Sequence, residues 1–176
     1  MANSVAEASA ALRSHAAIHD RAGQYLTFSI GPEVYGIEIL KVQEIIGMMP
    51  VTKVPRSPDF VRGVINLRGK VIPVIELRKK FEMEQRDDTS MTCIIVVQVA
   101  TATQSITMGV IVDEVAEVVA IATEQIEPAP QFGAGVRTEF ILGIGKIASK
   151  VVILLDVDKV LSWSELSTID EAAREQ

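Results

Sequence analysis

FVRGVINLRGKVIPVIELRKKF, from Phe60 to Phe81, decides how this chain folds, because a related stretch follows 80 positions later. The second stretch, FILGIGKIASKVVILLDVDKVL, runs from Phe140 to Leu161 and aligns with the first over 22 positions without a gap. Each copy predicts a strand, a tight turn, a second strand and a short helix. A recurring block of this kind indicates one small fold that is used twice.

A second pair of related stretches supports the duplication. YGIEILKVQEIIGMMPVTKVP, from Tyr35 to Pro55, matches MGVIVDEVAEVVAIATEQIEP, from Met108 to Pro128, at a spacing of 73. Both pairs occur in the same order along the chain, so duplication explains them better than chance.

The composition favours a packed β protein. The chain has 176 residues and 19.1 kDa, with 48% apolar residues but only 5% aromatic ones, so Val, Ile, Leu and Ala must form the core. No apolar run reaches the roughly 18 residues of a membrane span, and the N-terminus has no secretory signal pattern, which predicts a cytoplasmic protein. Cys93 lies in the apolar run MTCIIVVQV and is expected to pack rather than react.

The charge is unevenly distributed. A net charge of −6 argues against nucleic acid as a partner. Residues 23–81 carry nine Lys and Arg against five Asp and Glu, a balance of +4, whereas residues 92–162 carry four against eight, a balance of −4. Either the halves present different faces to different partners, or their surfaces drifted apart by accident.

The chain reads as a flexible arm, two small β units and a tail. We expect the arm at 1–22, one barrel at about 23–81, a second at about 92–162, and a helix or tail at 163–176, with strand exchange between the barrels left open. Closed barrels would remove the exposed edges of such short strands, and halves of this size should share an apolar seam that also creates a groove. Within the units we expect helical or irregular structure at 40–46, a kink at 113–117, and strands at 24–30, 34–39, 63–67, 71–75, 92–99, 106–112, 118–122, 142–147 and 151–155.

No enzyme signature is complete. Gly143 to Lys146 (GIGK) resembles part of a phosphate loop, but it lacks the first glycine and the final Ser or Thr. His15 and His19 are four residues apart in the arm but have no third ligand, so we predict no metal, no cofactor and no catalytic residues. The acidic groups at 113–117 and 156–158 are interpreted as solvated faces or helix caps. These observations favour a binding protein.

The sequence resembles the CheW family of bacterial chemotaxis adaptors. The resemblance runs from about Gln24 to Leu161 and rests on YLTFSIGPEVYGIEILKVQEII, VPRSPDFVRGVINLRGKVIPVIELRKKF, GVIVDEV and VVILLDVDKVL. It implies two packed SH3-like five-stranded β-barrels with short helices, no enzymatic activity, and coupling of chemoreceptor cytoplasmic tips to the regulatory domain of the histidine kinase CheA. It also implies recruitment to membrane-associated receptor arrays without insertion into the membrane.

The resemblance places two contact surfaces on this chain. An apolar groove between the barrels would bind the receptor tip by helix-in-groove recognition, and the matching positions are Ile39, Val42, Glu44, Arg68 and Val115. An ion pair between Glu44 and Arg68 is expected. The positions that match the kinase-binding surfaces are Gly63, Gly69, Thr92 and Gly109, although the first and last of these also suit close packing of the backbone.

Two alternatives stay open at this point. The same fold would serve as an adaptor in a related pathway that controls pilus motility or responds to a second messenger. A small nucleotide-binding enzyme that uses the GIGK stretch is the alternative from another class, with Lys146 as its phosphate ligand.

Overall fold

The computed structural model describes residues 22–101, 103–130 and 139–160, which hold eleven strands and four short helices. The His15 and His19 pair, the segment 131–138, the expected helix at 163–176 and all of the arm except residue 22 lie outside these ranges. In the described ranges, no helix is long and apolar enough to cross a membrane.

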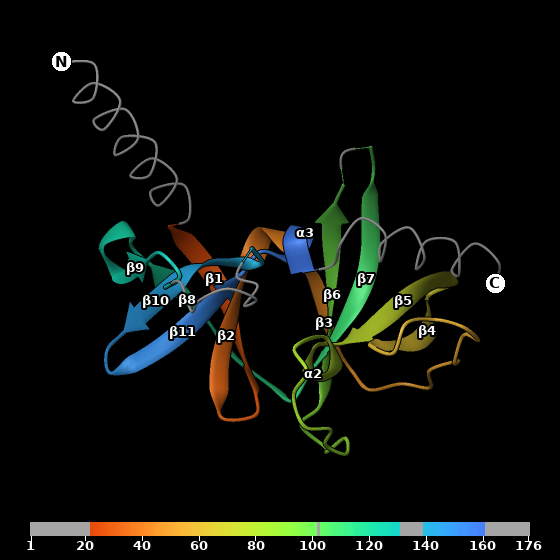
Figure 1. Cartoon of the computed structure of the whole chain (residues 1–176). Coiled ribbons are helices and arrows are strands. Elements are labelled where there is room, and N and C mark those ends of the chain that lie inside the picture. The colour runs from red at the N-terminus through yellow and green to blue at the C-terminus, as the bar shows by residue number, and fades with distance from the viewer. Residues whose placement is uncertain (1–21, 102, 131–138, 161–176) are drawn as a thin grey trace.

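The strands form two sheets that lie side by side in Figure 1, with the short helices α2 (Leu77–Lys80) and α3 (Val157–Val160) near their junction. The six-stranded sheet has the order β8, β1, β2, β11, β10, β9, and the five-stranded sheet has the order β3, β6, β7, β5, β4. The strands of the six-stranded sheet are β1 (Gly23–Ile30), β2 (Glu33–Glu38), β8 (Glu114–Ile121), β9 (Ile126–Glu127), β10 (Ile141–Ile147) and β11 (Lys150–Leu155). Those of the five-stranded sheet are β3 (Val42–Gly47), β4 (Val61–Leu67), β5 (Lys70–Glu76), β6 (Cys93–Ala100) and β7 (Ser105–Val112).

The two sheets exchange strands between the halves of the sequence. The six-stranded sheet combines β1 and β2 with β8 to β11, whereas the five-stranded sheet combines β3 to β5 with β6 and β7. The exchange is reciprocal, because the parallel pair β2 and β11 repeats as the parallel pair β7 and β5. The expected barrel boundaries at 23–81 and 92–162 are therefore wrong, and the strand exchange that the sequence left open is what the chain adopts.

The largest apolar cluster lies between the sheets and is called the seam cluster below. It combines Phe28 and Ile37 of the six-stranded sheet with Ile95, Val97 and Val110 of the five-stranded sheet, all of them buried. Each sheet also has a smaller cluster on its other face. Central strands such as β6 are thus buried on both faces. Separating the two sheets would expose the seam cluster to water.

The expected fold class is confirmed: the protein is all-β, with two packed β units and few helical residues. One unit has a sixth strand, β9, which is only two residues long and pairs with β10. The other unit has an isolated bridge between Thr52 and Val64 beside β4. The duplicated units therefore match even at their edges.

The two related hairpins, β4–β5 and β10–β11, have the same irregularities. The register of each shifts at its glycine, between Val61 and Gly63 in the first hairpin and between Ile141 and Gly143 in the second. Glu76, the last residue of β5, donates its backbone N–H to the carbonyl of Phe60, and Asp156, the residue after β11, donates its backbone N–H to the carbonyl of Phe140. These shared details confirm that the hairpins are two copies of one design.

Two local expectations need correction. Only Ile39–Lys41 form a helical turn, the 3₁₀ helix η1, and the segment from Val42 onwards is the strand β3. The irregularity expected at 113–117 is present at Asp113 and as a register shift against β1 between Val115 and Val118, but the strand β8 already starts at Glu114. In both places, pairing with a distant strand, β6 for β3 and β1 for β8, extends the segment where the local pattern was ambiguous.

Pro73 fits its sheet because its strand has only one partner there. β5 pairs with β4 along its length, and Pro73 is opposite Val64, but its pairing with β7 begins at Val74. A proline has no backbone N–H to donate to the ladder, so it is tolerated where no second partner strand is paired.

Candidate functional site

Three of the expected receptor-binding residues lie where the chain passes between the sheets. Ile39 begins η1, Val42 begins β3, and Val115 is the second residue of β8. All three are partly buried and pack against the seam cluster. The structure therefore brings them to one cluster from distant parts of the sequence.

The inside of the seam is closed. The cavity between Ile37, Val97 and Leu155 has a volume of about 10 Å³, which is at most enough for one water molecule. This enclosed cavity is therefore too small to hold a helix, and the groove expected between the barrels stays a prediction. A partner that uses Ile39, Val42 and Val115 has to approach from the surface.

Leu40 is an exposed apolar residue that was not among the positions predicted from the sequence. It lies in η1 next to Ile39, and its side chain is 93% exposed, more than that of the other exposed large apolar residues. At the spacing of 73 its counterpart is Asp113, a polar residue. This mismatch was a signal in the sequence that Leu40 lies at the surface. If the position belonged to the core in both repeats, both repeats would have an apolar residue there.

Glu44 and Arg68 form the expected ion pair, from Arg68 Nη2 to Glu44 Oε1. Glu44 is on β3 and Arg68 is in the turn between β4 and β5, so the pair joins strands from the two ends of the five-stranded sheet. The Arg68 side chain is 71% exposed and that of Glu44 is 29% exposed. Such a pair adds under about 1 kcal/mol to stability, yet it presents a guanidinium at the surface.

Arg68 also has an unusual backbone conformation. Its φ is 52°, and the following Gly69 has φ of 87°, so both central residues of this turn are in the left-handed region. That geometry suits a two-residue hairpin turn, but it is costly for any residue with a Cβ atom. Ala148, the counterpart of Arg68 in the second hairpin, has the same conformation but no charge.

The expected kinase-binding glycines differ in environment. A Cβ atom on Gly63 would lie 2.1 Å from the Thr52 carbonyl oxygen, and one on Gly109 would lie 2.7 Å from Ile94 Cγ2. Both glycines are buried, so each has a clear packing role. Gly69 is exposed and has open space around its Cα, so it is the glycine of the three whose surface a partner can reach.

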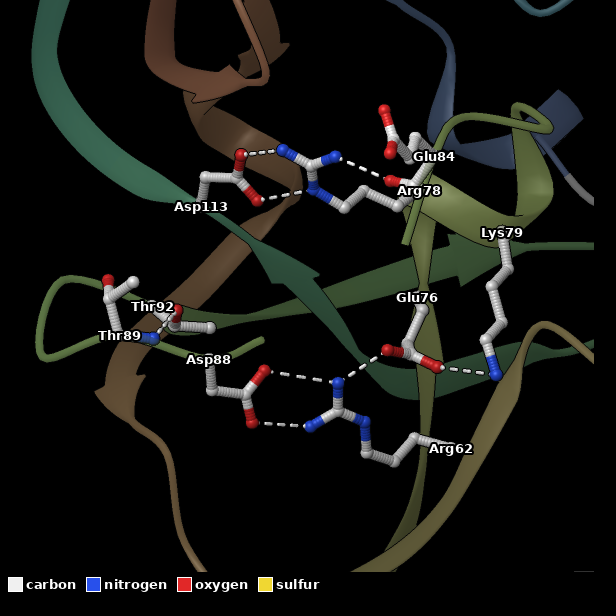
Figure 2. A network of polar contacts seen from close by, with 9 residues as sticks. All are labelled: Arg62, Glu76, Arg78, Lys79, Glu84, Asp88, Thr89, Thr92 and Asp113. Carbon is white, nitrogen blue, oxygen red and sulfur yellow. Dashed lines mark hydrogen bonds and ion pairs between the residues drawn. The ribbon is translucent and has the colours of Figure 1, made fainter. Parts of the chain in front are cut away.

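Thr92 directly follows the linker of residues 82–91. Its hydroxyl accepts a hydrogen bond of 2.8 Å from the Thr89 N–H, and its own N–H donates to the Thr89 carbonyl at 3.2 Å. The side chain is almost fully buried. Thr92 therefore fixes how the linker enters β6, and Figure 2 shows this contact beside the charged residues of the linker.

The Asp113 carboxylate lies at one crossover, a point where the chain passes from one sheet to the other, and it accepts three hydrogen bonds. The Arg78 Nε atom is 2.9 Å from Asp113 Oδ1, its Nη2 atom is 2.5 Å from Asp113 Oδ2, and the Gly31 N–H donates to Oδ2 at 2.8 Å (Figure 2). Hydrogen bonds from Arg78, followed by the one from Gly31, hold the pKa of Asp113 below its ordinary value against the opposing effect of burial. The contact ties α2 to the turn between β1 and β2.

The other crossover has a similar contact with the charges reversed. Lys41 Nζ of η1 is 2.7 Å from Asp158 Oδ2 of α3, and the Ala100 N–H donates to Asp158 Oδ1 at 2.8 Å. The hydrogen bond to Asp158 raises the pKa of Lys41. Asp158 is the counterpart of Arg78 at the spacing of 80, and Lys41 is the counterpart of Glu114, the neighbour of Asp113, at the spacing of 73, so the two contacts occupy similar places in the duplicated fold.

Comparison with known proteins decides the family. The CheW-like domain model matches residues 24–165. The chain belongs to the CheW family of chemotaxis adaptors. Among its relatives is the chemotaxis protein CheW of Klebsiella aerogenes, which is 40% identical over 151 residues, 86% of this chain and 89% of that protein. The CheW protein of Treponema pallidum is 33% identical over 87% of this chain and 90% of its own length.

The fold agrees with a solved CheW structure. The scaffolding protein TtCheW from Thermoanaerobacter tengcongensis superposes with a TM-score of 0.72 at 35% identity, covering 82% of this chain and 95% of that one. The CheW fold also explains the GIGK stretch. Gly143 to Lys146 lie within β10, and Lys146 pairs with Glu127, so this stretch does not form the strand-to-helix loop that cradles a phosphate.

Proposed function

We propose that this CheW-family protein is a non-catalytic adaptor that couples chemoreceptor signalling tips to the regulatory domain of the histidine kinase CheA. The observation that carries the proposal is the match to the CheW family over nearly the whole described chain, in sequence and in fold. From the cytoplasm, such a protein is recruited to membrane-associated receptor arrays through its two partners.

The receptor surface in this proposal combines Ile39, Val42, Val115, Glu44 and Arg68. The first three supply apolar surface at the crossovers, and the exposed Leu40 beside them extends it. Arg68 supplies a guanidinium, which binds a carboxylate or a backbone carbonyl through parallel hydrogen bonds. The ion pair with Glu44 holds that side chain near the surface until a receptor group takes its place.

The kinase surface in this proposal combines Gly63, Gly69, Thr92 and Gly109. Gly69 offers direct backbone contact because it is exposed, whereas the other three are buried and act by shaping the strands and the linker around them. Arg68 and Gly69 are consecutive residues of one turn. The proposal therefore requires the two partners to meet close to that turn.

Two binding measurements on the same variants test this function. We expect the purified chain to bind a receptor signalling tip and a CheA regulatory domain, and Arg68→Ala and Glu44→Ala to weaken receptor binding about fivefold or more while CheA binding changes less. Lys150→Ala, in the equivalent turn region of the other hairpin, is the matched control and should bind both partners normally. If the wild-type chain bound neither partner at micromolar concentration, the adaptor function would be wrong.

A further inference from the structure

An open cavity of about 670 Å³ lies between the segment 51–59 and the five-stranded sheet. Its walls include Lys53 and Arg56 from the segment, Arg62 from β4, Glu76 at the end of β5, and Lys79 from α2. None of the expected receptor-binding residues lines it. Its volume is in the range of sites that bind a ligand or a short peptide.

The cavity is positively charged in an acidic protein. Four of its lining residues are cationic, Lys53, Arg56, Arg62 and Lys79, against the two acidic residues Asp59 and Glu76. Lys53 and Arg56 are exposed, and within residues 22–101, 103–130 and 139–160 neither forms an ion pair. Arg56 is also held at φ of 62°, a conformation that costs a residue with a Cβ atom about 1 kcal/mol. These two charges contribute no ion pair to the described fold, so they are available to a ligand.

Arg62 already binds a carboxylate at this cavity. Its Nη1 atom is 2.6 Å from Asp88 Oδ2 and its Nη2 atom is 3.1 Å from Asp88 Oδ1, while Nη2 also contacts Glu76. Figure 2 shows the guanidinium between the two carboxylates. Asp88 belongs to the acidic linker 82–91, and Gln85 of the same linker also lines the cavity. The structure therefore shows that the Arg62 guanidinium binds a carboxylate of an acidic peptide segment.

Another carboxylate could replace Asp88 as the partner of Arg62 at little cost. The Asp88 side chain is 38% exposed, so water can replace Arg62 as its partner and the pair adds under about 1 kcal/mol. Glu76, by contrast, is 11% exposed and is also 3.4 Å from Lys79 Nζ. Loss of Asp88 would therefore leave Arg62 oriented by Glu76 and facing an open cavity.

We propose that this cavity binds an acidic segment of a partner polypeptide, with one carboxylate replacing Asp88 on Arg62 and others contacting Lys53 and Arg56. A phosphate ligand fits less well, because Glu76 would repel a compact polyanion. Pro55 and Pro58 in the lining also lack the backbone N–H groups that phosphate sites use. Carboxylates spaced along a peptide suit cations that come from separate segments of the wall.

The linker of the protein supplies a defined probe. A labelled peptide with the sequence of residues 82–91, EMEQRDDTSM, is titrated with the full chain at low salt, and binding is followed by fluorescence anisotropy. We expect Asp88→Asn to bind the peptide about fivefold tighter than the wild type, because the internal competitor is removed. In the Asp88→Asn background, adding Lys53→Glu and Arg56→Glu should weaken binding at least tenfold.

The matched control reverses the same number of charges elsewhere. Lys150→Glu with Lys159→Glu changes two exposed lysines that lie in β11 and α3, outside the cavity, and should leave the affinity of the Asp88→Asn protein within twofold. An equal loss in the control would mean that only net charge matters and would overturn the site. So would equal affinities of wild type and Asp88→Asn, absence of peptide binding to Asp88→Asn at millimolar concentration, or ATP that displaces the peptide and binds more tightly.

This inference goes beyond the adaptor function and does not depend on it. The test uses a peptide from the linker and no chemotaxis partner, so failure of the cavity would leave receptor and CheA binding to be judged separately. If the cavity is confirmed, any partner with an acidic segment becomes a candidate occupant, and Asp88 acts as its internal competitor.

Discussion

At the scale of single residues, Asp113 connects three separate parts of the fold. Its carboxylate accepts two hydrogen bonds from Arg78 and one from the Gly31 N–H, and its side chain is 22% exposed. It is the single residue between β7 of one sheet and β8 of the other. Removing its charge would leave the partly buried Arg78 without its main partner, which costs more than the pair itself contributes.

We predict that Asp113→Asn lowers the free energy of unfolding by about 2 kcal/mol at neutral pH. The folded pKa of Asp113 is lower than its ordinary value of 3.8, so its contribution is complete above that pH and is lost as the pH falls through the folded pKa. Urea unfolding of both proteins at pH 7 and near pH 3 measures this, and the difference should shrink at the lower pH. Asp87→Asn, in the exposed linker, is the control and should change little.

Arg68 is predicted to serve binding more than stability. Arg68→Gly removes an exposed ion pair, worth under about 1 kcal/mol, and relieves the left-handed conformation at φ of 52°. We therefore expect thermal unfolding to change little or to move slightly upwards, while receptor binding falls as for Arg68→Ala. A large loss of stability in Arg68→Gly would contradict this assignment and would make the ion pair with Glu44 a structural contact.

At the scale of elements, the shift of register in β4 depends on a glycine. Gly63 lies beside Thr52, whose N–H and carbonyl bond with Val64 at 2.9 and 2.8 Å. This close approach attaches the segment 51–59, and with it one wall of the cavity, to the edge of the sheet. An added methyl group would collide with a backbone atom that cannot move without breaking that bridge.

We predict that Gly63→Ala lowers the free energy of unfolding by about 2 kcal/mol or more, through overpacking and a φ of 153°. Gly47→Ala is the control, because a Cβ atom there meets nothing within 4 Å and its φ is not positive. Urea unfolding compares the two. If Gly63→Ala were as stable as Gly47→Ala, the close contact with Thr52 would be wrong.

The local pattern predicted most strands but missed β3. Both strands of each related hairpin and the first hairpin follow from alternating apolar residues and turn residues. In β3, the adjacent Ile45 and Ile46 disturbed the alternation, although Ile45 turns out to be 43% exposed. Pairing with β6 makes the segment a strand, and a contact between residues so far apart in the sequence leaves no local trace.

At the scale of the whole molecule, strand exchange makes the two sheets one structural unit. Residues 42–81 and 92–112, which include the five-stranded sheet, carry eight Lys and Arg and three Asp and Glu, whereas residues 23–41 and 113–162 carry five and ten. Counted over the same residues, the balance of +4 and −4 between the halves of the sequence thus becomes +5 and −5 after the exchange. The uneven charge persists after the exchange, which favours the interpretation of different faces over accidental drift.

We predict that cutting the chain between the exposed residues Ser90 and Met91 does not separate its halves. Each half supplies strands to both sheets, so the fragments can part only by unfolding both. A protease site inserted there, followed by size-exclusion chromatography, should give one folded species at neutral pH and two fragments in denaturant. Independent modules at 23–81 and 92–162 would instead separate, or unfold in two steps.

The site was only partly accessible from the sequence. The pair of Glu44 and Arg68 was expected from resemblance and is present, and Ile39, Val42 and Val115 do meet on one cluster. Asp113, which was interpreted as a solvated acid, binds Arg78, and Leu40 was not noticed at all. The first error concerns a contact between elements, for which composition and spacing carry little information, whereas Leu40 was marked in the sequence by its charged counterpart Asp113.

Local chemistry alone was enough to predict the duplication, the all-β class and the turn at Arg68 and Gly69, because alternation, glycine conformation and repeated blocks act over a few residues. The family followed from resemblance to known sequences. The tertiary structure decided which strands pair, that β1 and β2 join the second half, and which charges meet at the crossovers. Local sequence does not decide the pairing because each strand has two edges, and the backbone groups of either edge can hydrogen-bond to many different strands. The choice among them depends on burying the seam cluster, which exists only when distant segments are folded together.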